Sequence, residues 1–395
     1  MVVPCAFNEG NTGVAESYLV SQSGGGDVLV RLPSHADHVG SLLRPPDLQE
    51  ARAQHAAGTL SAEALRHIED RCIQDVIRMQ EAIGLKTATD GEYRRAFWHF
   101  DFLAGLDGVE MVEIESGIQF SGDQQVRPVG PAVTNKIDYT TDHMVDHFVF
   151  LKQHTHVTPK QSIPSPTALH YRGGRKAIST AVYPETEAFF HDLGLAYQKA
   201  IAAFARAGCT YLQLDEVYLA YLYDPKQHEE LRSRGEEPEG LAQTYAKLIN
   251  LAIAERPAEM TLAMHLCRGN FRSSWIAQGG YEPVADMLFN DIGIDVYFME
   301  YDTERAGGFE PLRFVPKDKM VVLGLVTSKT GELEDKDQIK RRIEAATQFV
   351  SIDQLGLSPQ CGFASTEEGN VLTVDAQRAK LALVVEVAEE VWGVS

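Results

Sequence analysis

Short apolar runs alternate along the chain with longer segments in which apolar side chains recur every three to four residues. The first pattern predicts buried β-strands and the second predicts amphipathic helices. We expect eight strands, at residues 28–32, 86–90, 161–164, 211–215, 261–265, 296–300, 320–325 and 354–357. Helical patterns follow most of them, most clearly at residues 61–83, 185–207, 241–255, 336–350 and 376–392. Alternating strands and helices are typical of a parallel sheet covered by helices, so we predict an α/β fold, specifically a (β/α)8 TIM barrel.

The connection between the second and third predicted strands is much longer than a simple loop. We treat residues 93–160 as an insertion, in which residues 109–137 alternate like a β-hairpin and residues 142–154 are helical in pattern. The pattern leaves open whether the insertion covers a site or forms an interface. Residues 1–28 lack periodicity and contain a Gly-rich tract, which predicts a flexible extension. We therefore expect a single catalytic barrel over residues 29–395.

Composition and charge exclude several classes of partner. The chain is 44% hydrophobic and 23% charged, which is typical of a protein with a large buried core. Its formal charge of −20 repels phosphate backbones and anionic membranes, so we expect no nucleic-acid or membrane partner. No apolar run approaches the roughly 18 residues of a membrane span, and no signal peptide is recognisable, so we expect a cytoplasmic protein. The sequence is compatible with a homo-oligomer but does not specify one.

Five scattered cysteines are too few for a disulfide framework, which leaves core, catalytic or metal-binding roles. His265 and Cys267 stand two apart at a predicted strand end, so their side chains share one face, and imidazole with thiolate suits zinc. Glu300 ends the sixth predicted strand and Cys361 follows the eighth, which a closed barrel brings to the same rim. We predict that His265, Cys267, Glu300 and Cys361 bind Zn²⁺.

Two other interpretations of these cysteines stay open. A cysteine at a strand end is often a small buried hydrophobic residue, and a lone His-x-Cys pattern has little specificity. Alternatively, Cys267 and Cys361 form a redox pair, although nothing like a Cys-x-x-Cys arrangement is present.

Polar side chains at the other strand ends are candidates for catalysis and substrate binding, because barrel active sites form there. Asp215 and Glu216 directly follow an apolar strand, so at least one carboxylate faces the mouth, where it can bind an ammonium group. We assign catalysis and substrate binding to Asp215 and substrate binding to Glu216, with solvated surface charge as the alternative. His38 is a candidate general acid or base, and a structural histidine is the alternative.

Ser41, Glu92 and Ser165 are further candidates for substrate binding at the same predicted rim. Taken alone, Ser41 is as typical of a turn and Glu92 of a solvated surface. Only their shared position at the strand ends favours a functional role.

These residues, in this order, resemble the catalytic barrel of the cobalamin-independent methionine synthase family, in particular its short single-barrel members. The similarity extends from about residue 35 to the C-terminus. The matching segments are residues 38–45, 90–94, 163–166, 212–216, 265–271, 298–302 and 358–363. Members of this family bind zinc through a His-x-Cys pair, a glutamate and a later cysteine. The resemblance places these ligands at His265, Cys267, Glu300 and Cys361.

The resemblance also implies a reaction, the transfer of a methyl group to the thiol of homocysteine to give methionine. The family holds the amino acid end of homocysteine with a serine, a glutamate and an aspartate, which correspond to Ser41, Glu92 and Asp215. Full-length members carry a second, N-terminal barrel that helps to bind methylfolate, and this chain is too short to contain one. The stretch that holds a candidate acid histidine in those members reads Leu-Val-Thr-Ser-Lys at residues 325–329. The alkyl donor is therefore open between a folate, a methylated corrinoid and another small methylated compound.

Three alternative functions remain. Epoxyalkane:coenzyme M transferases also use a zinc-bound thiolate, but a sulfonate tail favours Arg or Lys, whereas Glu92 and Asp215 favour the ammonium of homocysteine. Uroporphyrinogen decarboxylase, a more distant barrel relative, needs no zinc and would require arginines for its substrate. A non-catalytic zinc scaffold would require a closed metal site that no thiol can enter.

Overall fold

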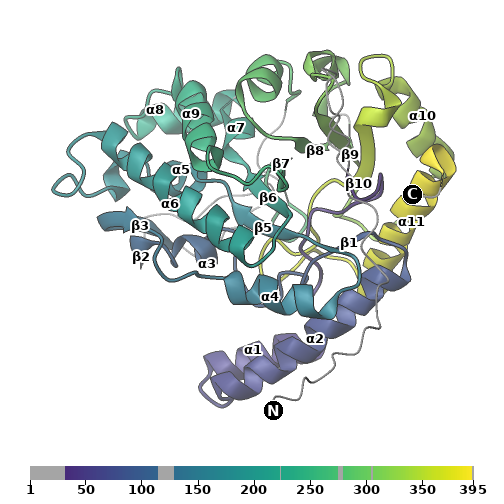
Figure 1. Cartoon of the computed structure of the whole chain (residues 1–395), viewed down its shortest axis with the longest axis horizontal. Coiled ribbons are helices and arrows are strands. Elements are labelled where there is room, and N and C mark those ends of the chain that lie inside the picture. Colours follow the sequence, from purple (N-terminus) through teal and green to yellow (C-terminus); the bar gives the residue numbers. More distant parts are fainter. Residues whose placement is uncertain (1–31, 114–128, 223, 275–278, 304–305, 394–395) are drawn as a thin grey trace, which may run out of the picture.

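The computed structural model describes residues 32–113, 129–222, 224–274, 279–303 and 306–393 (Figure 1). The strands are β1 (Thr87–Ala88), β2 (Asp107–Glu113), β3 (Val129–Asp138), β4 (Thr158–Pro159), β5 (Gln161–Pro164), β6 (Tyr211–Glu216), β7 (Thr261–Leu266), β8 (Val296–Glu300), β9 (Met320–Val326) and β10 (Leu355–Pro359). The α-helices are α1 (Pro46–Ala56), α2 (Ala62–Ala82), α3 (Phe100–Leu103), α4 (Val145–His154), α5 (Thr167–Gly173), α6 (Thr186–Arg206), α7 (Tyr218–Tyr221), α8 (Pro225–Ser233), α9 (Leu241–Ile253), α10 (Lys336–Ala346) and α11 (Val374–Trp392). Short helical turns lie at Arg175–Ala177, Met287–Asp291, Glu310–Phe314 and Ile352–Gln354.

Parallel strands form the centre of the molecule, in the order β10-β9-β8-β7-β6-β5. The short strand β4 leads into β5 through one residue and pairs in parallel with β1, which extends the run of strands. At the other edge, Ala36 forms a parallel bridge with Leu357 of β10. Figure 1 shows α2, α4, α6, α9, α10 and α11 around the outside of these strands. The structure thus confirms an α/β fold and seven of the predicted strands, from 86–90 to 354–357.

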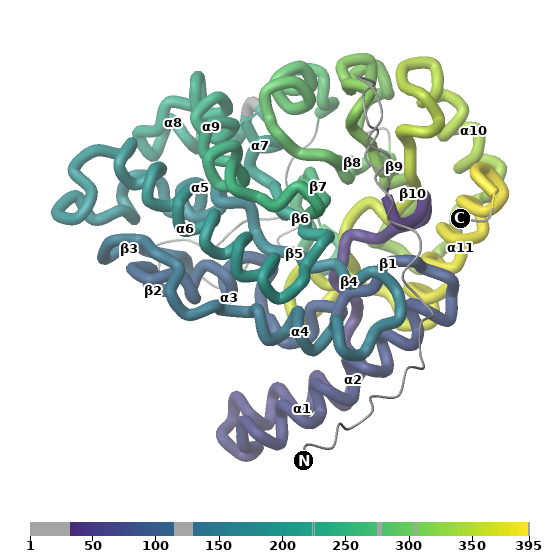
Figure 2. Tube along the Cα trace, viewed as in Figure 1, coloured from purple at the N-terminus to yellow at the C-terminus, as the bar shows by residue number. Residues whose placement is uncertain are grey.

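The first predicted strand, residues 28–32, falls almost entirely outside the described residues, and Leu32 itself lies in no strand. Its place beside β10 is taken by the bridge at Ala36, and Figure 2 shows this part of the chain, in purple, next to β10. Within the described residues, no backbone ladder joins the segment after Ala36 to β1, so the strands do not form a closed ring of ladders.

A buried ion pair connects the segments at this gap. Lys160, between β4 and β5, is fully buried, and its Nζ lies 3.4 Å from Asp37 Oδ2. The same Nζ donates to the backbone oxygen of His38 at 2.6 Å. Asp37 also accepts hydrogen bonds from Tyr211 Oη at 2.8 Å and from Thr87 Oγ1 at 2.7 Å. One carboxylate therefore joins the first segment, β1, the β4–β5 junction and β6.

The backbone after Asp37 turns inward, and side chains rather than a neighbouring strand satisfy its carbonyl groups. Val39 O accepts from Gln213 Nε2 at 2.8 Å, and Gly40 O accepts from Thr89 Oγ1 at 2.7 Å. Gly40 has φ +140°, and a Cβ there would lie 2.6 Å from Glu92 Oε1. Because these carbonyls are already bonded, the segment cannot continue a regular ladder.

The predicted insertion contains the predicted hairpin and helix. β2 and β3 are antiparallel over residues 107–138, with residues 114–128 outside the described part, and α4 lies within the predicted helix. The hairpin packs beside α5 and α6: Val133 bridges to Ile178, and the N–H of Ile137 donates to Tyr183 Oη at 2.9 Å. The predicted extension at residues 1–28 also lies outside the described residues, so the domain boundaries stay a prediction.

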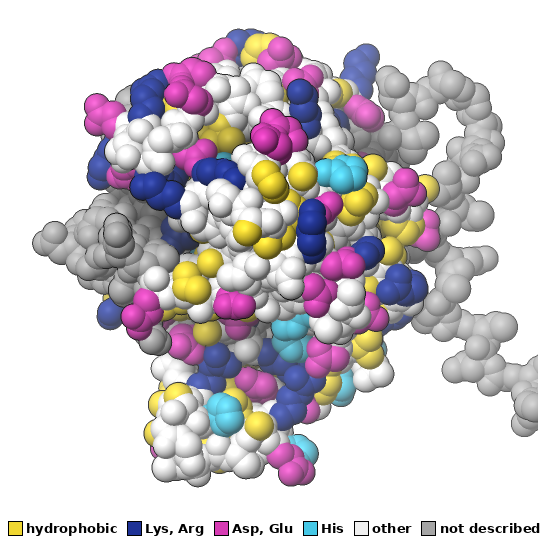
Figure 3. Space-filling view, turned by 90° about the vertical axis from the view of Figure 1, so that its left-hand side faces the viewer, with side chains coloured by type: hydrophobic (Ala, Val, Ile, Leu, Met, Phe, Trp, Pro, Cys, Tyr) yellow, Lys and Arg dark blue, Asp and Glu magenta, His cyan; other side chains and the backbone are white. Residues whose placement is uncertain are grey.

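The five helices predicted most clearly are all present as α2, α6, α9, α10 and α11. Within the described residues, none of these or the other helices has both the length and the apolar character needed to cross a membrane. Figure 3 shows acidic and basic side chains distributed over one face of the molecule.

We predict that Lys160→Met destabilises the protein by about 3–5 kcal/mol, because it leaves the Asp37 carboxylate buried without its countercharge. Urea unfolding followed by circular dichroism measures the change. The matched control is Lys136→Met, which breaks a surface ion pair with Asp192 and should cost less than about 1 kcal/mol. Equal losses in the two variants would contradict the structural role assigned to Lys160.

Candidate metal centre and active site

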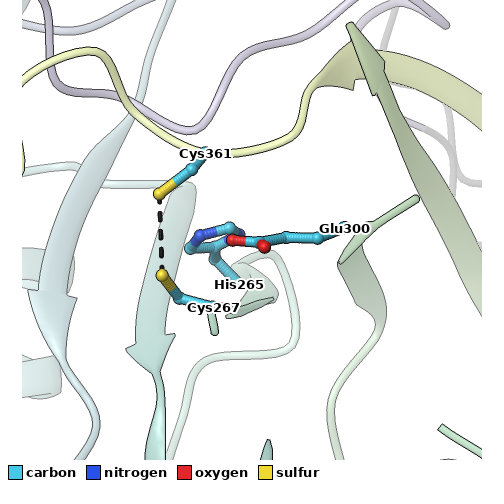
Figure 4. A group of neighbouring side chains, drawn as sticks. All are labelled: His265, Cys267, Glu300 and Cys361. Atoms are coloured by element: carbon cyan, nitrogen blue, oxygen red, sulfur yellow. Dashed lines mark hydrogen bonds between the residues drawn. The ribbon is translucent and has the colours of Figure 1, made fainter. Parts of the chain in front are cut away.

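Four side chains from different strand ends converge on one point. His265 lies in β7 and Glu300 ends β8, whereas Cys267 and Cys361 follow β7 and β10. Each offers one ligand atom, and these atoms all lie within 4.8 Å of one another. Figure 4 shows the four side chains pointing toward a common centre. All four are buried, so the structure brings together the complete set predicted from the sequence.

The donor set suits zinc. The sulfur atoms of Cys267 and Cys361 are 3.6 Å apart, close to the roughly 3.8 Å that tetrahedral geometry with Zn–S bonds of about 2.3 Å requires. Neither ring nitrogen of His265 has a hydrogen-bond partner among the described residues, although both are buried. A buried imidazole without partners is costly, and a metal ion would satisfy it. Two sulfurs, one nitrogen and one carboxylate oxygen fit a zinc ion.

The protonation of these ligands also favours a bound cation. The hydrogen bond from Cys267 holds the pKa of the Cys361 thiol well below its usual range, and the same bond raises the pKa of Cys267 far above it. Burial, with the charge of Cys361, raises the pKa of Glu300 to about 7. The cluster cannot easily carry three negative charges without a cation, so metal binding should release protons.

Neighbouring groups fix the orientation of the ligands. The backbone N–H of Gly269 donates to Cys267 Sγ at 3.3 Å, and the N–H of Arg268 donates to Glu300 Oε1 at 3.4 Å. Tyr281 Oη accepts from the N–H of Glu300 at 2.9 Å. Such outer contacts hold ligands in place before a metal ion binds.

A pocket of about 600 Å³, measured out to the solvent at its mouth, opens beside the cluster. Its lining includes six residues predicted from the sequence: Ser41, Glu92, Asp215, His265, Cys267 and Cys361. Three of the four candidate metal ligands and three of the predicted substrate-binding residues therefore surround one cavity.

Two carboxylates line this pocket near the cluster: Asp215 is buried and Glu92 is partly buried. Glu92 has φ +58° and forms an ion pair with Arg95. Burial raises the pKa of Glu92 to about 7, with Arg95 lowering it and Asp215 raising it further. Burial also raises the pKa of Asp215, whose Oδ1 accepts from Gln213 Nε2 at 2.7 Å. Two neighbouring acids with one paired arginine form a suitable site for an additional cation such as an ammonium group.

Ser41 lies against the loop that carries Cys361. Its Oγ accepts from the N–H of Ala364 at 3.3 Å, and its backbone oxygen accepts from the N–H of Phe363 at 2.9 Å. A Cβ at Gly362 would lie 1.9 Å from Ser41 Oγ, so only glycine permits this approach.

Besides the predicted metal ligand Glu300, three predicted catalytic or substrate-binding residues do not line the pocket: His38, Ser165 and Glu216. Glu216 Oε1 accepts from the N–H groups of Tyr218 and Leu219, at 2.6 and 2.8 Å, while Oε2 accepts from Thr167 Oγ1 at 2.5 Å. It thus connects the starts of α5 and α7, and Ser165 Oγ lies 3.3 Å from Thr167 Oγ1.

His38 is buried, and burial lowers its pKa to about 4. This imidazole is therefore neutral at physiological pH. The functional roles of these three residues stay predictions.

The pocket also contains residues that sequence reasoning missed. Those with polar or aromatic side chains include Arg95, Trp98, His99, Arg172, Tyr218 and Tyr221. The first three belong to the predicted insertion, in a segment without periodicity. Only their position in the sequence could have indicated a role in the site, because all six follow strand-end residues that were predicted to belong to it.

Comparison with known proteins places the chain in a family. Residues 35–390 match the family model described as the catalytic domain of cobalamin-independent synthase. The uncharacterized protein YxjH of Bacillus subtilis is 49% identical over 364 residues, which cover 92% of this chain and 96% of that protein. A methionine synthase of Saccharolobus solfataricus is 24% identical over 336 residues, covering 82% of this chain and 86% of that protein.

The structural comparison agrees. A solved structure from Listeria monocytogenes, named as a candidate vitamin-B12-independent methionine synthase, is 42% identical and has a TM-score of 0.73. The match covers 91% of this chain and 98% of the Listeria chain. The family match over nearly the whole chain, the sequence relatives and the similar fold agree: the chain belongs to the cobalamin-independent methionine synthase family.

Proposed function

We propose that this protein is a zinc-dependent methyltransferase that transfers a methyl group to the thiol of homocysteine, giving methionine. One observation supports the proposal: the buried cluster of His265, Cys267, Glu300 and Cys361 adjoins a pocket that is also lined by the carboxylates of Glu92 and Asp215. The first feature suits a thiol and the second an ammonium group, and homocysteine carries both. We also propose that the parallel strands are the wall of a (β/α)8 barrel, completed between Gly40 and β1 by side-chain hydrogen bonds.

Different residues around the pocket would bind different groups of the substrate. Bound zinc would supply a Lewis acid that ionises a thiol at neutral pH. Glu92 and Asp215 bind the ammonium group, and Ser41 lies where a hydroxyl can donate to the α-carboxylate. Trp98 and Tyr218, whose ring centroids are 6.2 Å apart, cover the pocket and exclude water. In transfer, the thiolate sulfur forms a bond to the methyl carbon while the bond between that carbon and the methyl donor breaks, and the demethylated donor leaves with that electron pair.

The same zinc chemistry would serve a thiol with a sulfonate tail, such as coenzyme M. Arg95 is already paired with Glu92, and its Nη1 donates to the backbone oxygen of Ser365 at 2.7 Å. Next to the proposed metal ligands, the positive charge of Arg95 is thus already used, and the charge of Asp215 remains. This favours a substrate with an ammonium tail over one with a sulfonate tail.

Cys267→Ser and Cys361→Ser should each remove most of the bound zinc, because serine does not replace a thiolate ligand. Metal analysis of purified protein measures the loss. Cys72→Ser is the matched control, since Cys72 lies in α2 away from the cluster, and it should keep about one zinc per chain. Stoichiometric zinc in both ligand variants would disprove the assigned site.

Asp215→Asn should weaken homocysteine binding by about tenfold or more, because a charge-assisted hydrogen bond contributes about 1.5–3 kcal/mol. Calorimetry with zinc-loaded protein measures the affinity and the proton released on binding. The matched ligand is 4-mercaptobutanoate, which lacks the ammonium group and should bind both proteins equally. Tighter binding of coenzyme M than of homocysteine by the unaltered protein would favour the alternative substrate.

A further inference from the structure

Two side chains in the pocket have no task in binding homocysteine. His99 is 1% exposed and lines the pocket, and neither of its ring nitrogens has a hydrogen-bond partner among the described residues. Arg172, at the end of α5, also lines the pocket, and its buried Nε has no partner in the described part of the chain. Buried polar groups without hydrogen bonds destabilise the protein, and a bound ligand that bonds to them would remove that cost.

The position of His99 is fixed by its surroundings. Asp101 accepts hydrogen bonds from the N–H groups of Ala96 and Phe97, at 3.0 and 2.8 Å, and the N–H of Trp98 donates to the backbone oxygen of Ser365 at 2.9 Å. The His99 ring packs between Trp98 and Phe100, with centroid separations of 4.3 and 4.0 Å. The imidazole is therefore held rigidly while its nitrogens stay free, as in a preorganised binding site.

The electrostatics of Arg172 differ from those of the other arginine in the pocket. Arg95 is neutralised by Glu92, whereas Arg172 forms no ion pair with any described residue. Its guanidinium lies 5.9 Å from the ring centroid of Phe100, next to His99. Burial, together with Arg172 and Arg95, lowers the pKa of His99 well below its usual value, so the imidazole is neutral.

The pocket thus has two chemically distinct parts. Glu92 and Asp215 form an acidic part suited to an ammonium group, whereas Arg172 offers an unpaired positive charge. Next to Arg172, neutral His99 offers one donor and one acceptor. A guanidinium binds carboxylates and other anionic oxygen groups in two-point fashion, and it repels a positively charged ligand.

We propose that Arg172 and His99 bind an anionic oxygen group of the alkyl donor, so that the enzyme accepts small anionic donors and rejects sulfonium or quaternary ammonium donors. This inference rests on the proposed methyl transfer to homocysteine, because it assigns the second substrate to the part of the pocket that homocysteine leaves free. It makes Arg172 and His99 residues that determine donor specificity.

The test compares two methyl donors on the zinc-loaded full chain. Calorimetry without thiol measures the binding of 5-methyltetrahydrofolate, which carries carboxylates, and of S-methylmethionine, which carries a sulfonium group. The unaltered protein should bind the anionic donor, and it should bind the sulfonium at least about tenfold more weakly. Arg172→Gln and His99→Phe should each weaken binding of the anionic donor by about tenfold, whereas Arg172→Lys, which keeps the charge but loses the two-point geometry, should weaken it less than Arg172→Gln.

Controls separate this inference from the proposed function. Arg313→Gln, which removes a surface arginine paired with Glu282, should leave donor binding unchanged. Zinc content and homocysteine affinity should be unchanged in every variant. The inference would be wrong if the unaltered protein did not bind 5-methyltetrahydrofolate, or if the Arg172 and His99 variants bound it as tightly as the unaltered protein. It would also be wrong if the sulfonium donor bound more tightly than the folate. None of these results would contradict homocysteine methylation.

Two further outcomes are informative. A tenfold loss of homocysteine affinity in Arg172→Gln would show that Arg172 holds the thiol substrate, and the inference would fail alone. Failure of the unaltered protein to bind homocysteine would instead overturn the proposed function, and the donor titrations would still decide whether Arg172 binds anions.

Discussion

The carboxylate of Asp37 lies among the parallel strands, where it meets the ammonium group of Lys160 and the hydroxyls of Tyr211 and Thr87. Burying such a pair is costly, and the hydrogen bonds that Asp37 accepts from these hydroxyls and from the N–H of His38 offset part of that cost. The backbone that follows places Ser41 against the loop that carries Cys361. The contacts between the first segment and the neighbouring strands, and the position of Ser41 in the candidate site, therefore depend on one buried charge pair.

Local patterns in the sequence were enough to predict seven strands and the four side chains that meet in the candidate metal site. His265 and Cys267 share a face because strand side chains alternate, Glu300 ends β8, and Cys361 follows β10 of the same sheet. The contacts of Asp37 could not be predicted, because its partners lie 50 to 174 positions away and carry no local signature. The first predicted strand, residues 28–32, lies almost entirely outside the described residues, and the described segment that follows it has a single bridge at Ala36.

In strand β6, the alternation of side chains between the two faces of the strand could have separated the residues that line the site from those that do not. Tyr211, Gln213 and Asp215 face the interior, where they contact the inward-turned segment or the pocket. Glu216, one position later, faces the helices and connects α5 to α7. The pocket segment around His99 was missed for another reason: hydrogen bonds to Asp101 and Ser365 hold it in place, and no periodic pattern accompanies such irregular backbone.

The two sulfur atoms of the candidate metal site come from points 94 positions apart in the chain, with β8, β9 and β10 between them. A chain still emerging from the ribosome presents His265 and Cys267 before Cys361 exists. Until Cys361 has been made, the proposed metal site lacks one of its two sulfur atoms. The candidate site is therefore complete only after the last strand, β10, has been synthesised.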